Sequence, residues 1–164
     1  MINFTIILAD DEQQILYGMK NGIDWESLGF SVVGTAQNGK EALELIEEYH
    51  PDLLISDIKM PFMDGLELSK TIHENYINTK IILFSGWDDF EYARMALKYG
   101  AIDYLLKPIN RNEFNQALCR IYENEQKSKI QGVERKKDVL EQIKDKIDTN
   151  YMEDISLTNL AEAY

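Results

Sequence analysis

The chain has 164 residues, which is room for one compact domain and a short appendage but not for two full domains. Hydrophobic residues make up 45% and the formal net charge is −12, so the composition excludes general disorder and opposes binding to phosphate backbones or anionic membranes. The single cysteine excludes a disulfide framework, and one cysteine with two histidines does not make a zinc site. No apolar run is long enough to span a membrane. Together these features predict a cytoplasmic protein.

Five short apolar runs alternate with stretches of helical spacing up to residue 110, a pattern typical of a parallel sheet with crossover helices. We expect strands at Thr5–Ala9, Ser31–Ala36, Leu53–Ser56, Lys80–Phe84 and Ile102–Leu106. Four runs are apolar almost throughout, as in strands covered on both faces, whereas Ser31–Ala36 is weaker and is expected at a sheet edge. The predicted fold is α/β, a doubly wound five-stranded parallel sheet of order 2-1-3-4-5 with a C-terminal helical extension.

Helical spacing also predicts which faces of the helices are buried. The expected core stripes are Ala42, Leu45, Ile46 and Tyr49; Phe90, Ala93 and Leu97; and Phe114, Leu118, Ile121 and Tyr122. Cys119 is expected on the apolar side of the last of these helices, as a core residue and not as a reactive thiol.

The stretch after Tyr122 is helical and rich in both charge signs. Approximate heptad spacing joins Ile130, Val133, Leu140, Ile143 and Ile147. Lys136 and Lys137 interrupt it, so we predict a solvated linker helix over residues 123–147 in preference to a short coiled coil. The character changes again at Asp148, and an amphipathic helix is expected from near Ser156.

Polar residues interrupt the apolar runs at their carboxyl ends. Asp10 and Asp11 follow the first strand, Asp57 the third, Ser85 the fourth and Lys107 the fifth. Ligands of open α/β sheets bind outside those ends, near the point where the strand order reverses. The order 2-1-3-4-5 therefore predicts one acidic crevice formed by the three aspartates, with Ser85 and Lys107 along its rim.

Three adjacent carboxylates repel one another unless a cation joins them, and an all-oxygen set suits Mg²⁺. An ammonium and a hydroxyl beside the metal favour further negative charge, as is needed when a phosphoryl group lands on a carboxylate. Each residue alone has a simpler explanation as a helix cap, a turn residue or a surface charge. Their agreement at corresponding strand ends favours a phosphoryl acceptor.

Four motifs together resemble the receiver domain of two-component response regulators. They are Asp10-Asp11-Glu12, Asp57 with Met60-Pro61-Phe62-Met63-Asp64-Gly65, Ser85-Gly86 and Lys107-Pro108. The resemblance assigns residues 1–122 to a receiver and implies that Asp57 accepts a phosphoryl group from a sensor histidine kinase. It implies a phosphoacceptor and not an enzyme. Gly86 and Trp87 depart from the commonest pattern of the family.

The same resemblance implies roles for the other residues of the crevice. Asp11, Asp57 and the backbone carbonyl of Lys59 would bind Mg²⁺ directly, and Asp10 would act through water. Lys107, joined to Pro108 by a cis peptide, would contact the phosphoryl oxygen. The switch residues would be Ser85, which reaches the phosphoryl group, and Tyr104, which then turns inward and allows a homodimer. Gly65 would permit the turn after Asp57.

The segments Asp24-Trp25 and Leu28-Gly29-Phe30, with Ile155-Ser156-Leu157 in the tail, resemble response regulators joined to an AraC-type helix-turn-helix domain. On this resemblance residues 148–164 are the truncated start of that domain. The intact protein would then be a transcription regulator, and promoter DNA would bind only to the full-length chain.

Other functions remain as alternatives. A haloacid-dehalogenase-like, Mg²⁺-dependent aspartyl-phosphate phosphatase needs a second acid two residues after the nucleophile, where this sequence has Lys59. A flavodoxin-like cofactor binder needs a phosphate-cradling loop after the first strand, where Asp10 and Asp11 repel phosphate. A receiver with an output other than DNA binding is a third alternative.

Overall fold

The structure, a computed structural model, describes residues 3–76, 78–86 and 90–161, with side chains up to residue 145. The chain separates into two compact units, one ending at Tyr122 and the other beginning at Glu123. Within the described residues no helix has an apolar stretch long enough to cross a membrane.

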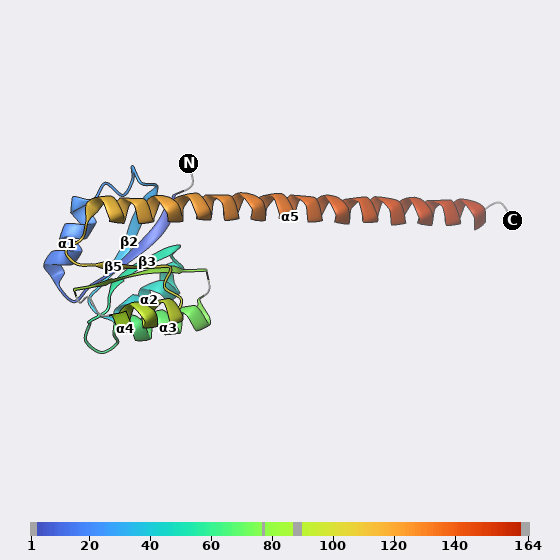
Figure 1. Ribbon diagram of the computed structural model, residues 1–164. Helices are drawn as coiled ribbons and strands as arrows, with labels where there is room; N and C mark the ends of the chain where they lie inside the picture. The colour runs from blue at the N-terminus through green and yellow to red at the C-terminus, as the bar shows by residue number, and fades with distance from the viewer. Residues whose placement is uncertain (1–2, 77, 87–89, 162–164) are drawn as a thin grey trace. The chain divides into compact units, whose positions relative to one another are not determined.

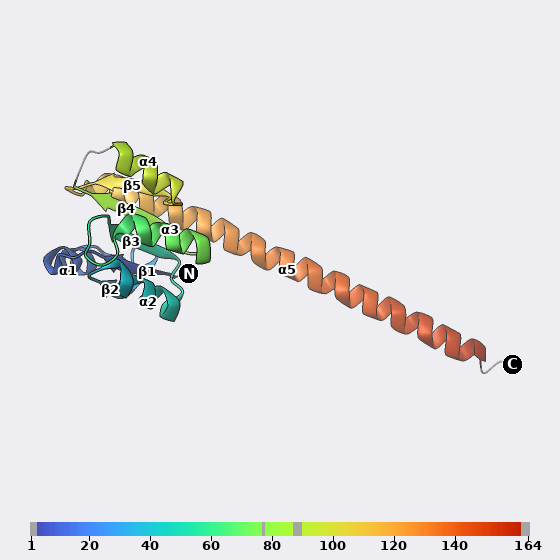
Figure 2. The same cartoon turned by 90° about the horizontal axis from the view of Figure 1, so that it is seen from below.

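The first unit is built on a five-stranded parallel sheet of order β2-β1-β3-β4-β5, which confirms the predicted fold class (Figure 2). The strands are β1 (Phe4–Ala9), β2 (Phe30–Ala36), β3 (Leu53–Asp57), β4 (Lys80–Ser85) and β5 (Asp103–Leu106). Each boundary lies within one residue of its prediction. The weakly apolar strand β2 lies at an edge as expected, and its register with β1 shifts between Ile6 and Ile7.

Helices cover both faces of the sheet. They are α1 (Gln13–Gly22), α2 (Gly39–Tyr49), α3 (Gly65–Asn75), α4 (Phe90–Lys98) and α5 (Arg111–Ala161). Helix α1 and the first turns of α5 cover one face, and α2, α3 and α4 cover the other (Figures 1 and 2). The first core lies between the sheet and α1 with α5, and the second core lies between the sheet and α2, α3 and α4. Because side chains alternate along a strand, Ile6 and Leu8 enter the first core while Ile7 and Ala9 enter the second.

The two helices that follow β2 and β3 each have a side-chain N-cap. The Asn38 side chain accepts a hydrogen bond from the Glu41 N–H at 2.9 Å, and the Asp64 side chain accepts one from the Glu67 N–H at 2.8 Å. Each cap satisfies an amide that has no partner inside its helix. The start of α3 at Gly65, eight residues after Asp57, is thereby fixed.

Three predictions about buried faces are wrong. Phe90 and Leu97 of α4 are exposed, and the helix instead buries Ala96 and packs Tyr92 and Met95 against the second core. This short helix carries two apolar stripes, and spacing alone does not choose between them. Cys119 is exposed because α5 buries Phe114, Ala117, Leu118 and Ile121, a stripe that excludes position 119. Tyr49 of the α2 stripe is also largely exposed.

Helix α5 runs without a break from Arg111 to Ala161, so Asp148 and Ser156 do not mark element boundaries. The predicted separate helix beginning near Ser156 is therefore wrong. The sequence from Val133 to Ala161 contains neither glycine nor proline, so no residue in it forces a helix to stop. The last three residues of the proposed 148–164 segment lie outside the described residues.

Candidate functional site

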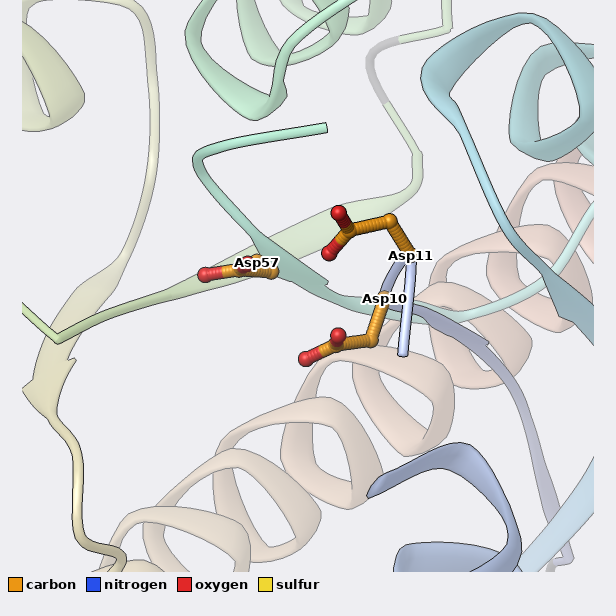
Figure 3. Close-up of side chains that lie close together, drawn as sticks. All are labelled: Asp10, Asp11 and Asp57. Atoms are coloured by element: carbon orange, nitrogen blue, oxygen red, sulfur yellow. The ribbon is translucent and has the colours of Figure 1, made fainter. Parts of the chain in front are cut away.

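The carboxyl ends of the parallel strands bring three carboxylates together. Asp10 and Asp11 directly follow β1, and Asp57 ends the neighbouring strand β3 (Figure 3). One carboxylate oxygen from each lies within 4.8 Å of the others. Asp10 is buried, Asp57 is partly buried and Asp11 is exposed, so the cluster runs from the sheet outward to solvent.

Lys107, from the end of β5, reaches into this cluster. Its Nζ lies 2.7 Å from Asp10 Oδ2 and 3.5 Å from Asp57 Oδ1. Its backbone N–H donates to the Ser85 carbonyl at 2.8 Å, and the Lys107–Pro108 peptide is cis, as predicted. The structure thus places the ammonium between two of the carboxylates, and it shows a contact with Asp10 that the sequence did not indicate.

The buried Asp10 is held from three directions. Its Oδ1 accepts the Glu12 N–H at 2.9 Å, its Oδ2 accepts from Lys107, and its own N–H donates to the Ala36 carbonyl at 3.0 Å. A buried carboxylate is stable only when paired and hydrogen-bonded. These bonds fix the carboxylate that lies deepest in the cluster.

Burial dominates the ionisation of Asp57. Desolvation, together with repulsion from Asp10, outweighs attraction by Lys107 and raises the pKa of Asp57 from 3.8 to about 6. Desolvation of Lys107 opposes its charge, but its hydrogen bond to Asp10 and attraction by both aspartates raise the pKa of Lys107 overall. At neutral pH Asp57 is therefore ionised and Lys107 is protonated.

These groups surround a small cleft of about 260 Å³. It is lined by Asp11, Glu12, Asp57, Lys59, Ser85, Gly86 and Lys107. Ser85 is buried at the end of β4, and the exposed Lys59 places its Nζ 5.9 Å from the centroid of the Tyr92 ring. Tyr104 is half-buried, packs against the second core and does not line the cleft, while Trp87 lies outside the described residues.

The chain matches the family described as the response regulator receiver domain over residues 6–119. It belongs to that family. The uncharacterised transcriptional regulatory protein YesN of Bacillus subtilis is 49% identical over 118 residues, which cover 72% of this chain and 32% of YesN. The chain spans less than half the length of this and other curated relatives, among them the transcriptional regulatory protein HptR of Staphylococcus aureus.

Solved structures agree with this assignment. The receiver domain of AraT, a response regulator from Geobacillus stearothermophilus, is 36% identical with a TM-score of 0.72, and the match covers 79% of this chain and 99% of that one. The CheX–CheY–BeF₃–Mg²⁺ complex from Borrelia burgdorferi contains a chain 26% identical, with a TM-score of 0.67 and coverage of 74% and 90%.

The backbone around Asp57 of the receiver is tightly packed. The Ile58 N–H donates to the Phe84 carbonyl, and the Gly65 N–H donates to the Ile58 carbonyl at 2.7 Å. A Cβ at Gly65 would lie 2.2 Å from the Asp57 carbonyl oxygen. Gly65 is thus needed for this close approach, and not for the positive φ that a turn glycine supplies. The positive φ in this loop, 66°, belongs instead to Phe62.

Asp10, Asp11 and Asp57 suit a hard divalent cation. Within the described part of the chain they are the one group of three or more potential ligand side chains close enough to share an ion. All three offer carboxylate oxygens, and the cleft adds no soft ligand, which favours Mg²⁺ over a transition metal. Glu12, which the sequence suggested only as part of a motif, also lines the cleft.

A larger cavity of about 450 Å³ lies between α1, the segment after it and the start of α5. Its walls are mostly apolar and include Ile15, Met19, Leu28 and Phe114. It does not contain the aspartate cluster, so the chemistry that the sequence predicts is confined to the smaller cleft.

Proposed function

We propose that this receiver accepts a phosphoryl group on Asp57 from a sensor histidine kinase, with Mg²⁺, and thereby controls a DNA-binding output in a longer regulator. The observation that carries this proposal is the position of the Asp57 carboxylate, which lines one cleft with Asp11 and the Lys107 ammonium and lies beside the buried Asp10. It acts as a phosphoacceptor and not as an enzyme with turnover.

In the transfer, a carboxylate oxygen of Asp57 attacks phosphorus while the bond from phosphorus to the histidine nitrogen breaks. The imidazole leaves as a neutral group after taking up a proton, and the aspartate becomes an acyl phosphate. Lys107 Nζ, 3.5 Å from Asp57 Oδ1, faces the charge that collects on the phosphoryl oxygens. Below its pKa of about 6, metal-free Asp57 is protonated and is a poor nucleophile.

The proposed metal ligands are Asp11, Asp57 and the backbone carbonyl of Lys59, with Asp10 acting through water. When bound, the ion neutralises negative charge between the acceptor and the phosphoryl oxygens. The exposed Asp11 and the partly buried Asp57 offer oxygens toward solvent, whereas Asp10 is engaged with Lys107. The Mg²⁺ named for the similar CheY complex supports the choice of metal.

The proposed switch joins the cleft to the surface of α4 and β5. Phosphorylation adds a charge of about −2 beside Ser85, and an inward movement of Ser85 would let Tyr104 turn. Phe90, Leu97 and Leu106 are exposed apolar residues on α4 and β5. We infer that a second copy covers them in the phosphorylated homodimer.

The proposed output is an AraC-type DNA-binding domain that binds promoter DNA in the longer protein. The names of the relatives YesN and HptR as transcriptional regulators support a DNA-binding output. The tail motif and the Asp24-Trp25 segment support the AraC type. In this assignment residues 123–147 link the receiver to that domain, and residues 148–164 belong to its start.

Intact-mass measurement after incubation with a small phosphodonor and Mg²⁺ tests the acceptor. The chain should gain one phosphoryl group, and Asp57→Asn should abolish the gain. Asp138→Asn, on the exposed surface of α5, is the matched control and should label like the unchanged chain. Undiminished labelling of Asp57→Asn would refute the assignment of the acceptor.

A further inference from the structure

Helix α5 continues beyond the receiver with an apolar surface exposed to solvent. Ile130, Val133 and Leu140 are 51%, 67% and 66% exposed. A free helix with such residues on its surface is only marginally stable in water, because helices in proteins are stabilised mainly by packing of an apolar face. The sequence spacing of these residues and the charges beside them determine which partner surface would fit them.

The three residues fall into a heptad pattern. With Ile130 at position a, Val133 and Leu140 are at successive d positions, and Lys137 and Lys144 occupy the following a positions. The flanking positions separate by charge sign. Lys129 and Lys136 are at g, with the exposed Ile143 at the third g position, while Glu134 and Glu141 are at e.

We propose that this surface, residues 129–145 of α5, docks against the same segment of a second copy as a parallel two-stranded coiled coil. In a parallel pair each g residue faces the e residue of the next heptad on the partner helix. Lys129 then meets the partner copy's Glu134, and Lys136 meets the partner copy's Glu141. All of these contacts are attractive and occur twice by symmetry.

The same charges oppose the other arrangements. An antiparallel pair would set g against g and e against e, which brings lysine to lysine and glutamate to glutamate. A shifted register with Val133 and Leu140 at a would place Lys137 and Lys144 at e, opposite Gly132 and Val139 at g, with no acidic partner. Charge complementarity therefore selects a parallel dimer in one register.

Lys137 and Lys144 set the strength of the pairing. A polar residue at an a position fixes register and oligomeric state at the expense of stability. Two of the three a positions between residues 129 and 145 are lysine, so the contact is a weak dimer and not a larger bundle. This inference does not depend on the proposed phosphorylation, since it concerns residues outside the receiver.

Sedimentation equilibrium of the whole chain, without metal or phosphodonor, tests the proposal. Lys137→Leu should tighten self-association about tenfold, because it replaces a charge at the seam with an apolar side chain. A Lys137→Leu chain that stays monomeric would overturn the proposal. Helix content measured by circular dichroism verifies that each variant is folded.

Charge-reversed variants in the Lys137→Leu background identify the contact. Lys129→Glu with Lys136→Glu, or Glu134→Lys with Glu141→Lys, should each weaken self-association about tenfold or more. A mixture of the two should regain it, because each repulsive contact becomes attractive between unlike chains. Asp138→Lys with Asp145→Lys, at b positions, makes the same charge change away from the seam and should have little effect. Equal behaviour of the e-position and b-position variants would overturn the proposal.

A disulfide at a d position tests the orientation. Leu140→Cys in a chain with Cys119→Ser should oxidise to a covalent dimer, because equivalent d residues face each other in a parallel pair. Asp138→Cys in the same background should not. Failure of the Leu140→Cys chain to cross-link, in a variant that still self-associates, would overturn the parallel arrangement.

Discussion

The hydrophobic core of the receiver and the cleft at the carboxyl edge of its sheet hold buried side chains in opposite ways. In the core, Phe114 packs edge-to-face on Trp25 at 5.9 Å and against Phe84 at 5.7 Å. In the cleft, Asp57 and Asp10 are drawn out of water beside each other, and the attraction of Lys107 does not offset the cost of burying the Asp57 carboxylate. The comparison shows that the free energy gained by packing the core offsets the free energy that burying charged groups in the cleft costs.

The largest effect is expected in the core. Phe114→Ala should lower the free energy of unfolding by about 3–5 kcal/mol, because it removes a buried ring and leaves a cavity. Urea unfolding measures the change. Phe62→Ala is the matched control, since that ring is exposed, and its effect should stay within about 0.5 kcal/mol. Similar losses for both would contradict the assignment of the core.

In the cleft, replacing a charged side chain should raise the free energy of unfolding instead of lowering it. The folded pKa of Asp57, about 6, exceeds its ordinary value of 3.8, so the stability gained by protonation is complete below pH 3.8 and is lost as pH rises through about 6. Asp57→Asn should therefore raise the free energy of unfolding by up to about 3 kcal/mol at pH 8.

This gain should shrink as pH falls and disappear near pH 4. Thermal unfolding of both proteins across that range measures it, in the absence of divalent metal. A constant difference between Asp57→Asn and the unchanged chain at pH 4 and pH 8 would show that its origin is not the ionisation of Asp57.

The apparent affinity for Mg²⁺ should depend on the ionisation of Asp57. Below pH 6 Asp57 must release a proton before it can bind Mg²⁺, so the apparent affinity should fall about tenfold, or about 1.4 kcal/mol, per pH unit. Isothermal titration calorimetry between pH 5 and 7 measures the slope. Asp57→Asn should lose most of the slope, and an unchanged slope in that variant would assign the proton to another group.

The smallest effect is expected for an ion pair at the surface. Arg120 Nη2 lies 3.0 Å from Asp103 Oδ2, with the two side chains 66% and 28% exposed. Arg120→Ala should change the free energy of unfolding by less than about 1 kcal/mol, and molar salt should abolish the difference. A loss as large as that of Phe114→Ala would show that water screens this pair far less than its exposure indicates.

The sequence was sufficient to predict the strands and the edge where the polar residues meet. Asp10, Asp57, Ser85 and Lys107 each end an apolar run, and parallel strands bring such ends together. The contact between Lys107 and Asp10 could not be predicted, because a lysine side chain has several rotamers and three carboxylates lie nearby.

The helices were harder to predict. On α4, Phe90 and Leu97 form one apolar stripe while Tyr92 and Met95 form another, and packing against the second core selects the latter. Cys119 adjoins the fully buried Leu118, yet one position along a helix turns a side chain by about 100°, which is enough to reach solvent. Periodicity locates a stripe but does not define its edges.

Lys107 gives the cleft a cation of its own. Three carboxylates and one ammonium leave a formal charge of −2, so a divalent ion meets less attraction than three carboxylates alone would provide. Occupancy should then vary with the concentration of free Mg²⁺, and a chelator should empty the cleft quickly. We therefore expect the partly buried Asp10–Lys107 pair to make Mg²⁺ an exchangeable ligand of the cleft and not a permanent part of the fold.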